Sequence, residues 1–233
     1  MQKQFDLSAY LVIGSENTRG RSVASIVESA IIAGFTCIQI RSKIATAREL
    51  IELVRQSAEV IARVNPNVTL LVDDRLDVVL AAQSLSVKVD GIHVGQSDIP
   101  VDICRKFLGE DAVIGLSART TDLIDYVKHA DVSDIDYFGA GPLHETATKP
   151  EAGRLDDGSI ITHSFDELRE LARISPRPIV VGGGVKVADL PQLASTGVDG
   201  FFVVSAIAGA DDPLTAAREL VDCWKAHRSK STR

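Results

Sequence analysis

The sequence contains few cysteines, no apolar segment of membrane-spanning length and no excess of basic residues. Its 3 cysteines in 233 residues lie far apart and match no metal-binding spacing, which is typical of reduced thiols in a cytoplasmic protein. The N-terminus has no apolar signal region, so we expect a cytoplasmic location and no membrane partner. The net charge of −7 argues against binding to nucleic acid or to an anionic membrane surface. A phosphorylated substrate remains compatible with that charge, because a local basic cluster can occur within an acidic protein.

Eight strand patterns alternate with helical patterns, and no Ser- or Pro-rich linker divides them. The strand patterns lie at residues 9–13, 36–40, 68–72, 91–94, 112–116, 135–140, 178–181 and 200–204, and the helical patterns at about 22–33, 46–64, 76–82, 101–108, 121–129, 165–174, 187–195 and 213–227. This alternation predicts an α/β fold, a single (β/α)₈ TIM barrel over residues 1–233 with a frayed tail from about residue 228. A doubly wound open sheet is the structural alternative, but the glycine fingerprint that usually follows its first strand is absent.

Acidic residues follow two neighbouring strand patterns within one βαβ unit, residues 70–100. Asp73 and Asp74 follow the third strand pattern, and Asp98 follows the fourth. The two strands of such a unit are parallel neighbours, so these carboxylates meet at one edge of the sheet. They would repel one another without a cation between them, and magnesium needs only one or two carboxylates besides water and phosphate. The alternative is that each aspartate only caps the helix that follows it.

Two further strand ends carry patterns that suit anions. Gln39, Arg41 and Lys43 follow the second strand with alternate spacing, which directs them to one side and suits a diphosphate. A solvated strand end explains that pattern equally well. Gly182 to Gly184 end the seventh strand and Ser205 ends the eighth, where many barrels bind a phosphate through backbone N–H groups. A flexible turn is the alternative explanation of the glycine run.

The histidines and hydroxyl residues give no sign of a nucleophilic catalytic triad. His93 lies inside an apolar strand and is expected to pack in the barrel, while His144 lies in the long loop after the sixth strand, within reach of a ligand. Lys149 lies in the same Thr- and Pro-rich loop, which favours a charge contact to phosphate over a Schiff base. Ser117 ends the fifth strand and joins the group of strand-end residues.

Together, the strand-end residues resemble the thiamine phosphate synthase family. The motifs that carry the resemblance follow the family's order over nearly the whole chain: 39–43 (QIRSK), 74–75 (DR), 91–98 (GIHVGQSD), 115–117 (GLS), 141–142 (GP), 146–150 (TATKP), 182–185 (GGGV) and 204–207 (VSAI). No single motif is specific, but their joint occurrence is. The resemblance implies a (β/α)₈ barrel that joins hydroxymethylpyrimidine diphosphate to thiazole phosphate, with Mg²⁺ required and thiamine phosphate and diphosphate as products.

The resemblance also implies roles for individual residues. The residues expected to take part in catalysis are Arg41, Ser117 and Lys149. Those expected to bind substrate are Gln39, Arg41, Lys43, Asp73, Ser117, Thr146, Thr148, Lys149, Gly183, Gly184, Val204 and Ser205. Among them, Gln39, Arg41 and Lys43 are expected to hold the diphosphate of the pyrimidine substrate, and Ser117 and Lys149 to contact it as it leaves. The thiazole phosphate is expected to bind at Thr146, Thr148, Gly184 and Ser205. Asp74 and Asp98 are expected to bind Mg²⁺. The expected reaction is dissociative: diphosphate leaves the pyrimidine methylene carbon, and the thiazole nitrogen then attacks the resulting cation.

Two positions bear on the alternatives to this assignment. The family usually has Asn before the first metal-binding aspartate, and this chain has Asp73 there, which leaves the role of that residue open. The thiazole tautomerase, a relative with the same fold, has a histidine directly after the glycine that ends the sixth strand, where this chain has Pro142. A tautomerase-like barrel and a non-catalytic phosphate-binding barrel are the alternatives. The sequence leaves the oligomeric state open, and a homo-oligomer is compatible with it.

Overall fold

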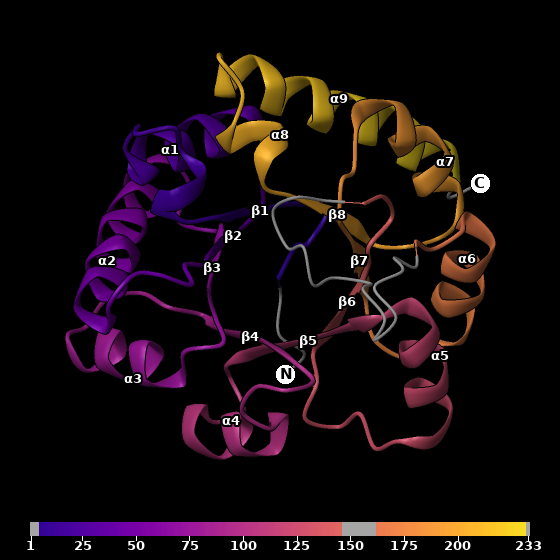
Figure 1. The fold of residues 1–233 in the computed structure, drawn as a ribbon, viewed down its shortest axis with the longest axis horizontal. Helices are drawn as coiled ribbons and strands as arrows, with labels where there is room; N and C mark the ends of the chain where they lie inside the picture. The colour runs from indigo at the N-terminus through magenta and orange to yellow at the C-terminus, as the bar shows by residue number, and fades with distance from the viewer. Residues whose placement is uncertain (1–4, 146–161, 232–233) are drawn as a thin grey trace.

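The computed structural model describes residues 5–145 and 162–231. Its eight parallel strands follow one another in sequence order around a closed barrel (Figure 1). The strands are β1 (Ala9–Ile13), β2 (Cys37–Ile40), β3 (Thr69–Asp73), β4 (Gly91–Gly95), β5 (Val113–Arg119), β6 (Tyr137–Gly141), β7 (Ile179–Val181) and β8 (Gly200–Val203). Pairing of β1 with β8 closes the ring, which confirms the predicted (β/α)₈ barrel.

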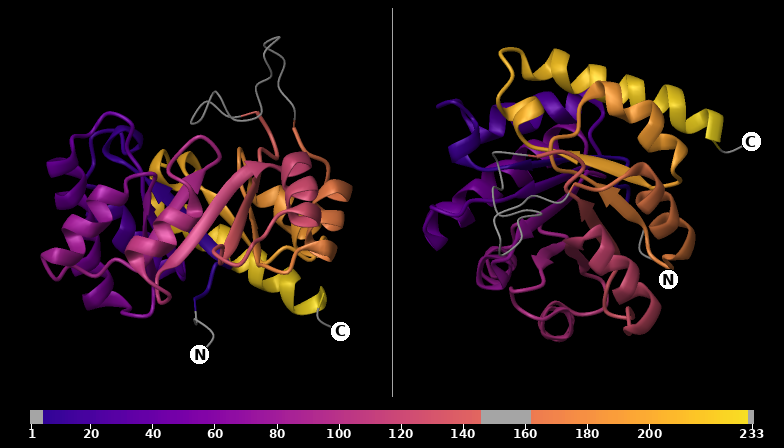
Figure 2. Two further views of the ribbon diagram at one scale, coloured as in Figure 1. Left: turned by 90° about the horizontal axis from the view of Figure 1, so that it is seen from below. Right: turned by 45° about the vertical axis from the view of Figure 1, so that its right-hand side comes forward.

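Helices cover the outside of the barrel and connect consecutive strands (Figure 1 and Figure 2). The α-helices are α1 (Val23–Ala33), α2 (Ala47–Val64), α3 (Leu76–Ser84), α4 (Val101–Leu108), α5 (Thr120–His129), α6 (Phe165–Ile174), α7 (Leu190–Ser195), α8 (Ser205–Ala208) and α9 (Pro213–Ser231), and 3-10 turns occur at η1 (Ser15–Asn17) and η2 (Val187–Asp189). Because the crossovers run over the outside, all strands end at the same face of the barrel. Within residues 5–145 and 162–231, no helix combines the length and the apolar character needed to cross a bilayer.

Local signals explain where the helices begin and end. Thr46 forms a capping box with Glu49, in which each side chain accepts a hydrogen bond from the other residue's backbone N–H, and α2 follows directly. Helix α1 ends at Gly34, whose φ of 106° lies in the left-handed region that glycine adopts without strain. These signals are local in sequence, so the corresponding boundaries agree with the predicted ones.

The clearest differences from the expected helices are α8, which the sequence did not predict, and the boundaries of two other helices. The helix expected over 187–195 is divided into η2 and α7, because Pro191 lacks an N–H and is favoured in the first turn of an α-helix. The tail expected to fray from about residue 228 instead continues α9 to Ser231. Residues 228–231 contain neither glycine nor proline, so nothing in them ends a helix.

The barrel has two separate hydrophobic cores. The larger lies between the strands and the surrounding helices, and the smaller fills the interior around Tyr10 and Tyr137. Strand residues alternate between the two cores, as the two-residue period of a strand requires. A Cβ atom at Gly115 would lie 2.2 Å from the Tyr137 ring, and one at Gly139 would lie 2.4 Å from Ser117 Oγ. Interior glycines therefore leave the space that larger side chains occupy.

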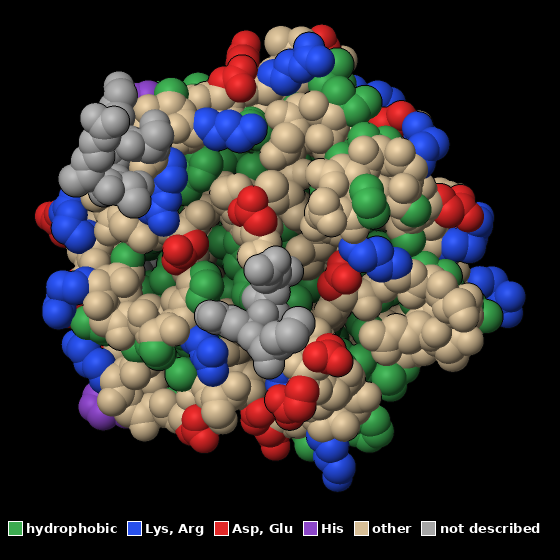
Figure 3. Space-filling view, turned by 180° about the vertical axis from the view of Figure 1, so that it is seen from behind, with side chains coloured by type: hydrophobic (Ala, Val, Ile, Leu, Met, Phe, Trp, Pro, Cys, Tyr) green, Lys and Arg blue, Asp and Glu red, His purple; other side chains and the backbone are tan. Residues whose placement is uncertain are grey.

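Aspartates at the amino ends of alternate strands hold the barrel together there. Each accepts a hydrogen bond from a backbone N–H of the preceding strand: Leu70 N–H to Asp90 Oδ2 (2.7 Å), Ile114 N–H to Asp136 Oδ2 (2.8 Å) and Ile179 N–H to Asp199 Oδ2 (2.8 Å). The similar sequences at 89–94 and 198–203 thus share a structural role. At this end of the barrel, acidic and basic side chains are interspersed around the edge (Figure 3).

Asp136 has a second role, as the counter-ion of Arg105, which is 7% exposed. Arg105 Nη2 donates to Asp136 Oδ2 (2.8 Å) and to Asp134 O (3.0 Å), and Nη1 donates to Ala112 O (2.7 Å). These bonds connect α4 with the segments that enter β5 and β6. A buried guanidinium whose carboxylate is removed remains out of water without a compensating charge, which is destabilising.

Asp136→Ala should therefore lower the free energy of unfolding by about 3 kcal/mol, because Arg105 stays buried without its nearest counter-ion. Urea unfolding followed by circular dichroism measures this change. The matched control is Glu52→Ala, which removes an exposed carboxylate paired with Arg55 on α2 and should leave the urea midpoint unchanged. Equal stability of Asp136→Ala and the parent chain would contradict this role of Asp136.

Candidate active site

A pocket of about 1110 Å³ opens at the carboxyl ends of the strands. All eight strands contribute to its lining, from Tyr10 on β1 to Phe202 on β8. Pockets for one drug-sized ligand usually have about 300–1,000 Å³. The volume is therefore sufficient for two small substrates side by side.

Asp73 is the last residue of β3, and Asp74 and Asp98 lie in the turns after β3 and β4. Asp74 has a φ of 59°, a left-handed conformation that aspartate tolerates better than most residues. Asp98 Oδ2 accepts a hydrogen bond from Gly95 N–H (2.8 Å). Arg75 and Pro100 are the residues that precede α3 and α4, and neither helix has a side-chain cap. The alternative that these aspartates only cap helices is therefore wrong.

Arg41 and Lys43 lie among these carboxylates. Arg41 Nε is 3.2 Å from Asp73 Oδ2, and Lys43 Nζ is 3.7 Å from the same oxygen and hydrogen-bonded to Asp74. Burial raises the pKa of Asp73, and the neighbouring Asp74 carboxylate raises it further, while Arg41 and Lys43 oppose the rise. Burial would also raise the pKa of Asp74, but its hydrogen bond with Lys43 and its interaction with the neighbouring Asp98 bring that pKa below its usual value. The five side chains therefore form one electrostatic cluster.

The donor set of this cluster suits a Mg²⁺ ion that protein and substrate hold jointly. Across residues 5–145 and 162–231, no group of three or more His, Cys, Asp and Glu side chains is placed to hold a metal. Burial and the neighbouring Asp74 carboxyl group raise the pKa of Asp98, and the Lys43 ammonium already lies against Asp74 as a cation. Two carboxylates, with the other positions filled by water and phosphate oxygens, are a usual Mg²⁺ environment. Asp98 lines the pocket, and Asp74 contacts two residues that do.

The loops after β7 and β8 form the other side of the pocket. Gly183 and Gly184 have φ values of 83° and 69°, which favour glycine. Gly182 O and Gly183 O accept hydrogen bonds from Leu143 N–H and His144 N–H, each 2.9 Å long. The glycine run is thus a hydrogen-bonded backbone conformation rather than a flexible turn. The lining residues on this side include Gly182, Gly183, Gly184, Lys186, Val204 and Ser205.

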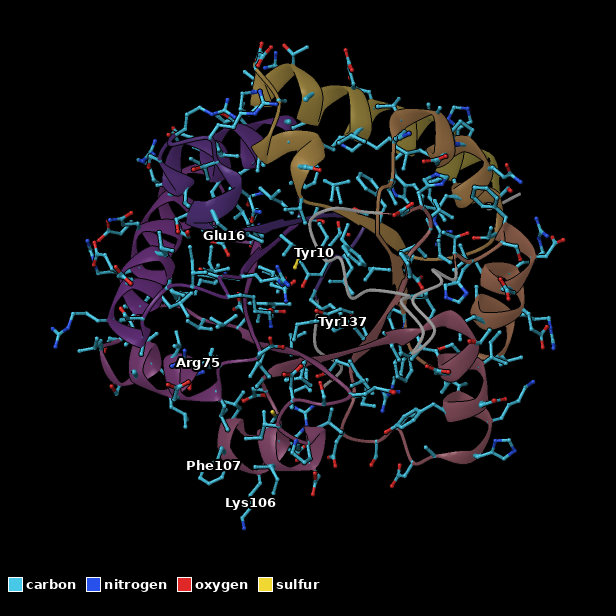
Figure 4. All side chains as sticks on the ribbon, viewed as in Figure 1. Tyr10, Glu16, Arg75, Lys106, Phe107 and Tyr137 are labelled. Carbon is cyan, nitrogen blue, oxygen red and sulfur yellow. The ribbon has the colours of Figure 1, made fainter. Side chains whose placement is uncertain are left out.

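A chain of hydrogen bonds crosses the floor of the pocket. We call it the floor network; its members are Asp73, Gln39, Tyr10, Tyr137, His93 and Ser117. Tyr10 and Tyr137 point into the centre of the barrel from β1 and β6 (Figure 4). The sequence analysis missed both tyrosines and treated His93 only as a packing residue. The alternation of residues along a strand could have identified Tyr137 as a residue that faces the barrel interior. It lies four positions before Gly141, at the end of the same strand, and therefore on the same face.

Most of the predicted substrate-binding residues meet in this pocket. Those that line it are Gln39, Arg41, Lys43, Asp73, Ser117, Gly183, Gly184, Val204 and Ser205. Thr146, Thr148 and Lys149 lie outside the described residues. His144, a possible ligand contact from the sequence, instead places Nε2 3.0 Å from Asp189 Oδ2.

A closed (β/α)₈ barrel with one polar pocket at its carboxyl rim defines the class of this protein, and comparisons with known proteins define its family. The family model described as thiamine monophosphate synthase matches residues 9–207. A thiamine-phosphate synthase of Corynebacterium efficiens is 38% identical over 217 residues, covering 93% of this chain and 94% of the relative. One of Natronomonas pharaonis is 36% identical over 220 residues, covering 93% and 94%. The chain belongs to the thiamine monophosphate synthase family, and its activity is thiamine-phosphate synthesis, a transferase reaction of thiamine biosynthesis.

Solved structures agree with this family. The thiamine phosphate pyrophosphorylase from Pyrococcus furiosus has a TM-score of 0.76 and 27% identity, covering 94% of this chain and 96% of that one. A 3-hexulose-6-phosphate synthase has a TM-score of 0.61 at 15% identity, covering 93% and 99%, and shares the fold alone.

Gly139→Ala should abolish most of the synthase activity, because the added Cβ would lie 2.4 Å from Ser117 Oγ and 3.2 Å from His93 Cε1 at the floor of the pocket. Steady-state release of diphosphate measures the effect. Gly109→Ala is the matched control, because a Cβ there has nothing within 4 Å and the position lies outside the pocket. It should leave the activity of the folded protein unchanged, although its positive φ costs stability. Full activity in Gly139→Ala would contradict this prediction, because it would show that Ser117 and His93 can be displaced without loss of activity.

Proposed function

We propose that the chain joins hydroxymethylpyrimidine diphosphate to thiazole phosphate inside this pocket and releases diphosphate. The observation that carries the proposal is the division of the pocket into two sides that suit anions. Arg41 and Lys43 lie with the carboxylates at the ends of β2 to β4, and the glycine run lies with Ser205 after β7 and β8. Substrates whose phosphates occupy these two sides would bring their reacting atoms together between them.

The side formed by β2, β3 and β4 is assigned to the pyrimidine diphosphate. Arg41 and Lys43 supply two cations for its phosphate oxygens. Asp74 and Asp98 would hold Mg²⁺, which when bound supplies further positive charge for the leaving diphosphate. Asp73 is assigned a different role, because its carboxylate contacts Arg41 and accepts from Gln39 Nε2 (2.7 Å). It orients Gln39 on β2 and Arg41, the residue directly after that strand.

The side formed by β7 and β8 is assigned to the thiazole phosphate. Backbone atoms of Gly183 and Gly184 can approach a phosphate closely because no side chain intervenes. Ser205 and Lys186, which carry a hydroxyl and an ammonium group, line the same wall. Lys186 was not predicted from the sequence, and its place beside the glycine run supports this assignment. Thr146 and Thr148 keep their expected roles here, as Lys149 does at the leaving diphosphate, on the resemblance alone.

The reaction requires little acid–base catalysis by the protein. The bond between the pyrimidine methylene carbon and the diphosphate oxygen breaks, and the electron pair leaves with diphosphate. The lone pair of the thiazole nitrogen then forms the new carbon–nitrogen bond, so no proton has to move. The protein's contribution is to neutralise the leaving group and to hold the nitrogen in line with the carbon. A pocket with cations on one side and no predicted catalytic triad supports this mechanism.

Two alternatives make different demands on the pocket. A tautomerase-like barrel would act on one substrate without a metal, and Pro142 stands where the tautomerase has its histidine. A non-catalytic barrel would bind phosphate ligands without releasing diphosphate.

We also propose a cytoplasmic location, which the three free cysteines support.

Removal of Mg²⁺ by EDTA should reduce diphosphate release from a mixture of both substrates to background, and excess Mg²⁺ should restore it. Asp98→Asn should raise the Mg²⁺ concentration needed for half-maximal rate about tenfold, because a neutral amide is a weaker ligand than a carboxylate. Asp102→Asn, at an exposed position on α4 outside the pocket, is the matched control and should behave like the parent chain. The magnesium assignment fails if EDTA has no effect.

Ser205→Ala should raise KM for thiazole phosphate about tenfold through the loss of a hydrogen bond to a charged oxygen. KM for the pyrimidine diphosphate should stay the same, because that substrate is assigned to the opposite side. Initial-rate kinetics with each substrate varied in turn separate the two constants. The control Ser195→Ala removes a hydroxyl that donates to Gln192 O on α7, away from the pocket. An effect of Ser205→Ala on the pyrimidine substrate alone would reverse the assignment of sides.

A further inference from the structure

The floor network is continuous from Asp73 to Ser117. Its bonds are Gln39 Nε2 to Asp73 Oδ1 (2.7 Å), Tyr10 OH to Gln39 Oε1 (3.1 Å), Tyr10 OH with Tyr137 OH (3.0 Å), Tyr137 OH with His93 Nδ1 (2.7 Å) and His93 Nε2 with Ser117 Oγ (2.5 Å). The first four distances lie within the usual range of a hydrogen bond, and the last is slightly shorter. The network begins beside the carboxylates of β3 and ends at a residue assigned to the pyrimidine diphosphate, so it connects two parts of the site.

The acidic end of the network determines which atoms donate in the first bonds. Asp73 Oδ1 accepts from the amide nitrogen of Gln39, so Gln39 Oε1 faces Tyr10. A carbonyl oxygen can only accept, and this bond therefore uses the single hydroxyl proton of Tyr10. In its bond with Tyr137, Tyr10 can consequently act only as the acceptor.

The same counting of protons continues to the other end. Tyr137 donates its only hydroxyl proton to Tyr10, so its oxygen must accept from His93. His93 Nδ1 then carries a hydrogen, and Nε2 of the neutral imidazole is an acceptor. The last bond is therefore donated by the Ser117 hydroxyl to His93 Nε2. Its proton points to the histidine, and its lone pairs are left for the pocket.

Burial supports this arrangement. Tyr10 is 1% and Tyr137 0% exposed, and burial raises the pKa of both phenols well above the usual value. Both hydroxyls therefore keep the protons that the counting requires. Gly115 provides the space for the ring of His93, since a Cβ there would lie 2.5 Å from Nδ1. The rings are fixed by tight packing as well as by hydrogen bonds.

We propose that His93, held by Tyr137, is a positioning residue that fixes the Ser117 hydroxyl with its lone pairs toward the pocket. The inference rests on the proposed function and deepens it, because it states how Ser117 meets the pyrimidine diphosphate. Ser117 accepts a hydrogen bond from an N–H or O–H group of the bound substrate complex. Contacts with the phosphate oxygens then belong to cations such as Arg41 and Lys43. A dipole fixed before the reaction needs no reorientation during it.

In its ionised form, which the neighbouring Arg41 and Lys43 cations favour, the Asp73 carboxylate secures this direction of the bonds. In the reversed direction, Gln39 Oε1 would face a carboxylate oxygen, and two acceptors cannot share a hydrogen bond. An amide at position 73 can rotate and donate, so Asp73→Asn permits both directions. Asp73, whose exact role the sequence left open, thus orients the Ser117 hydroxyl on β5.

Nitrogen-15 NMR of the imidazole ring measures the tautomer of His93 directly, and His93→Gln identifies its signal. The parent chain should show a protonated Nδ1 and an unprotonated Nε2, both alone and with inorganic diphosphate and Mg²⁺. Tyr137→Phe removes the acceptor of the Nδ1 hydrogen, and it should move the proton toward Nε2. A protonated Nε2 in the parent chain under either condition overturns the proposal.

Matched substitutions separate positioning from a purely structural role. His93→Gln places an amide oxygen near the Nε2 position and should keep kcat within about threefold of the parent value. His93→Asn is too short to reach Ser117 and should lower kcat about tenfold. KM for thiazole phosphate should stay unchanged in both variants, because its assigned site is on the other side of the pocket. Equal kcat values in the two variants contradict the proposal.

A double-mutant cycle shows whether His93 acts through Ser117. Ser117→Ala should lower kcat, and adding His93→Asn should then have no further effect. The proposal is overturned if His93→Asn lowers kcat by the same factor in the parent chain and in the Ser117→Ala variant. It is also overturned if Ser117→Ala alone leaves kcat unchanged. The NMR measurement needs no turnover. If the parent chain forms no thiamine phosphate, the proposed function fails, while the tautomer still decides the direction of the floor network.

Discussion

Parallel pairing of all eight strands is the constraint on which the rest of the structure depends. Because the helices return the chain along the outside, every strand ends at the same face, and side chains from residue 39 to residue 205 meet in one pocket. The register between strands matters equally, since a slip of one residue would turn inward side chains outward. At the amino ends, Asp90, Asp136 and Asp199 hold backbone N–H groups of the preceding strands and so help to maintain that register.

Within this frame, opposite charges are balanced over short distances. Asp73, Asp74 and Asp98 are tolerated together because Arg41 and Lys43 lie among them. A diphosphate that enters this side competes with the carboxylates for both cations, and a divalent metal offsets the negative charge that is then left without a partner. The same electrostatics that hold these five side chains together therefore favour joint binding of metal and diphosphate over the binding of either one alone.

Periodicity and turn residues predicted the strands and most helix boundaries, because these depend on neighbours in the sequence. The gathering of strand-end residues followed from the fold, since a parallel barrel has only one carboxyl rim. Contacts between distant side chains could not be predicted in this way. Asp74 and Asp98 have the sequence context of helix caps, and only the structure shows that their side chains do not cap α3 and α4. Tyr10, His93 and Tyr137 are buried, as apolar strands suggest, but their pairing depends on how β1, β4 and β6 face one another across the barrel.

The central claim is that the two phosphate-bearing substrates occupy opposite sides of one pocket. A crystal structure of the chain with thiamine phosphate, diphosphate and Mg²⁺ tests it most directly. The account predicts diphosphate against Arg41 and Lys43, the metal between it and the carboxylates of Asp74 and Asp98, and the phosphate of thiamine phosphate at the glycine run beside Ser205. Diphosphate bound after β7 and β8, or a product bound outside the pocket, would contradict the account.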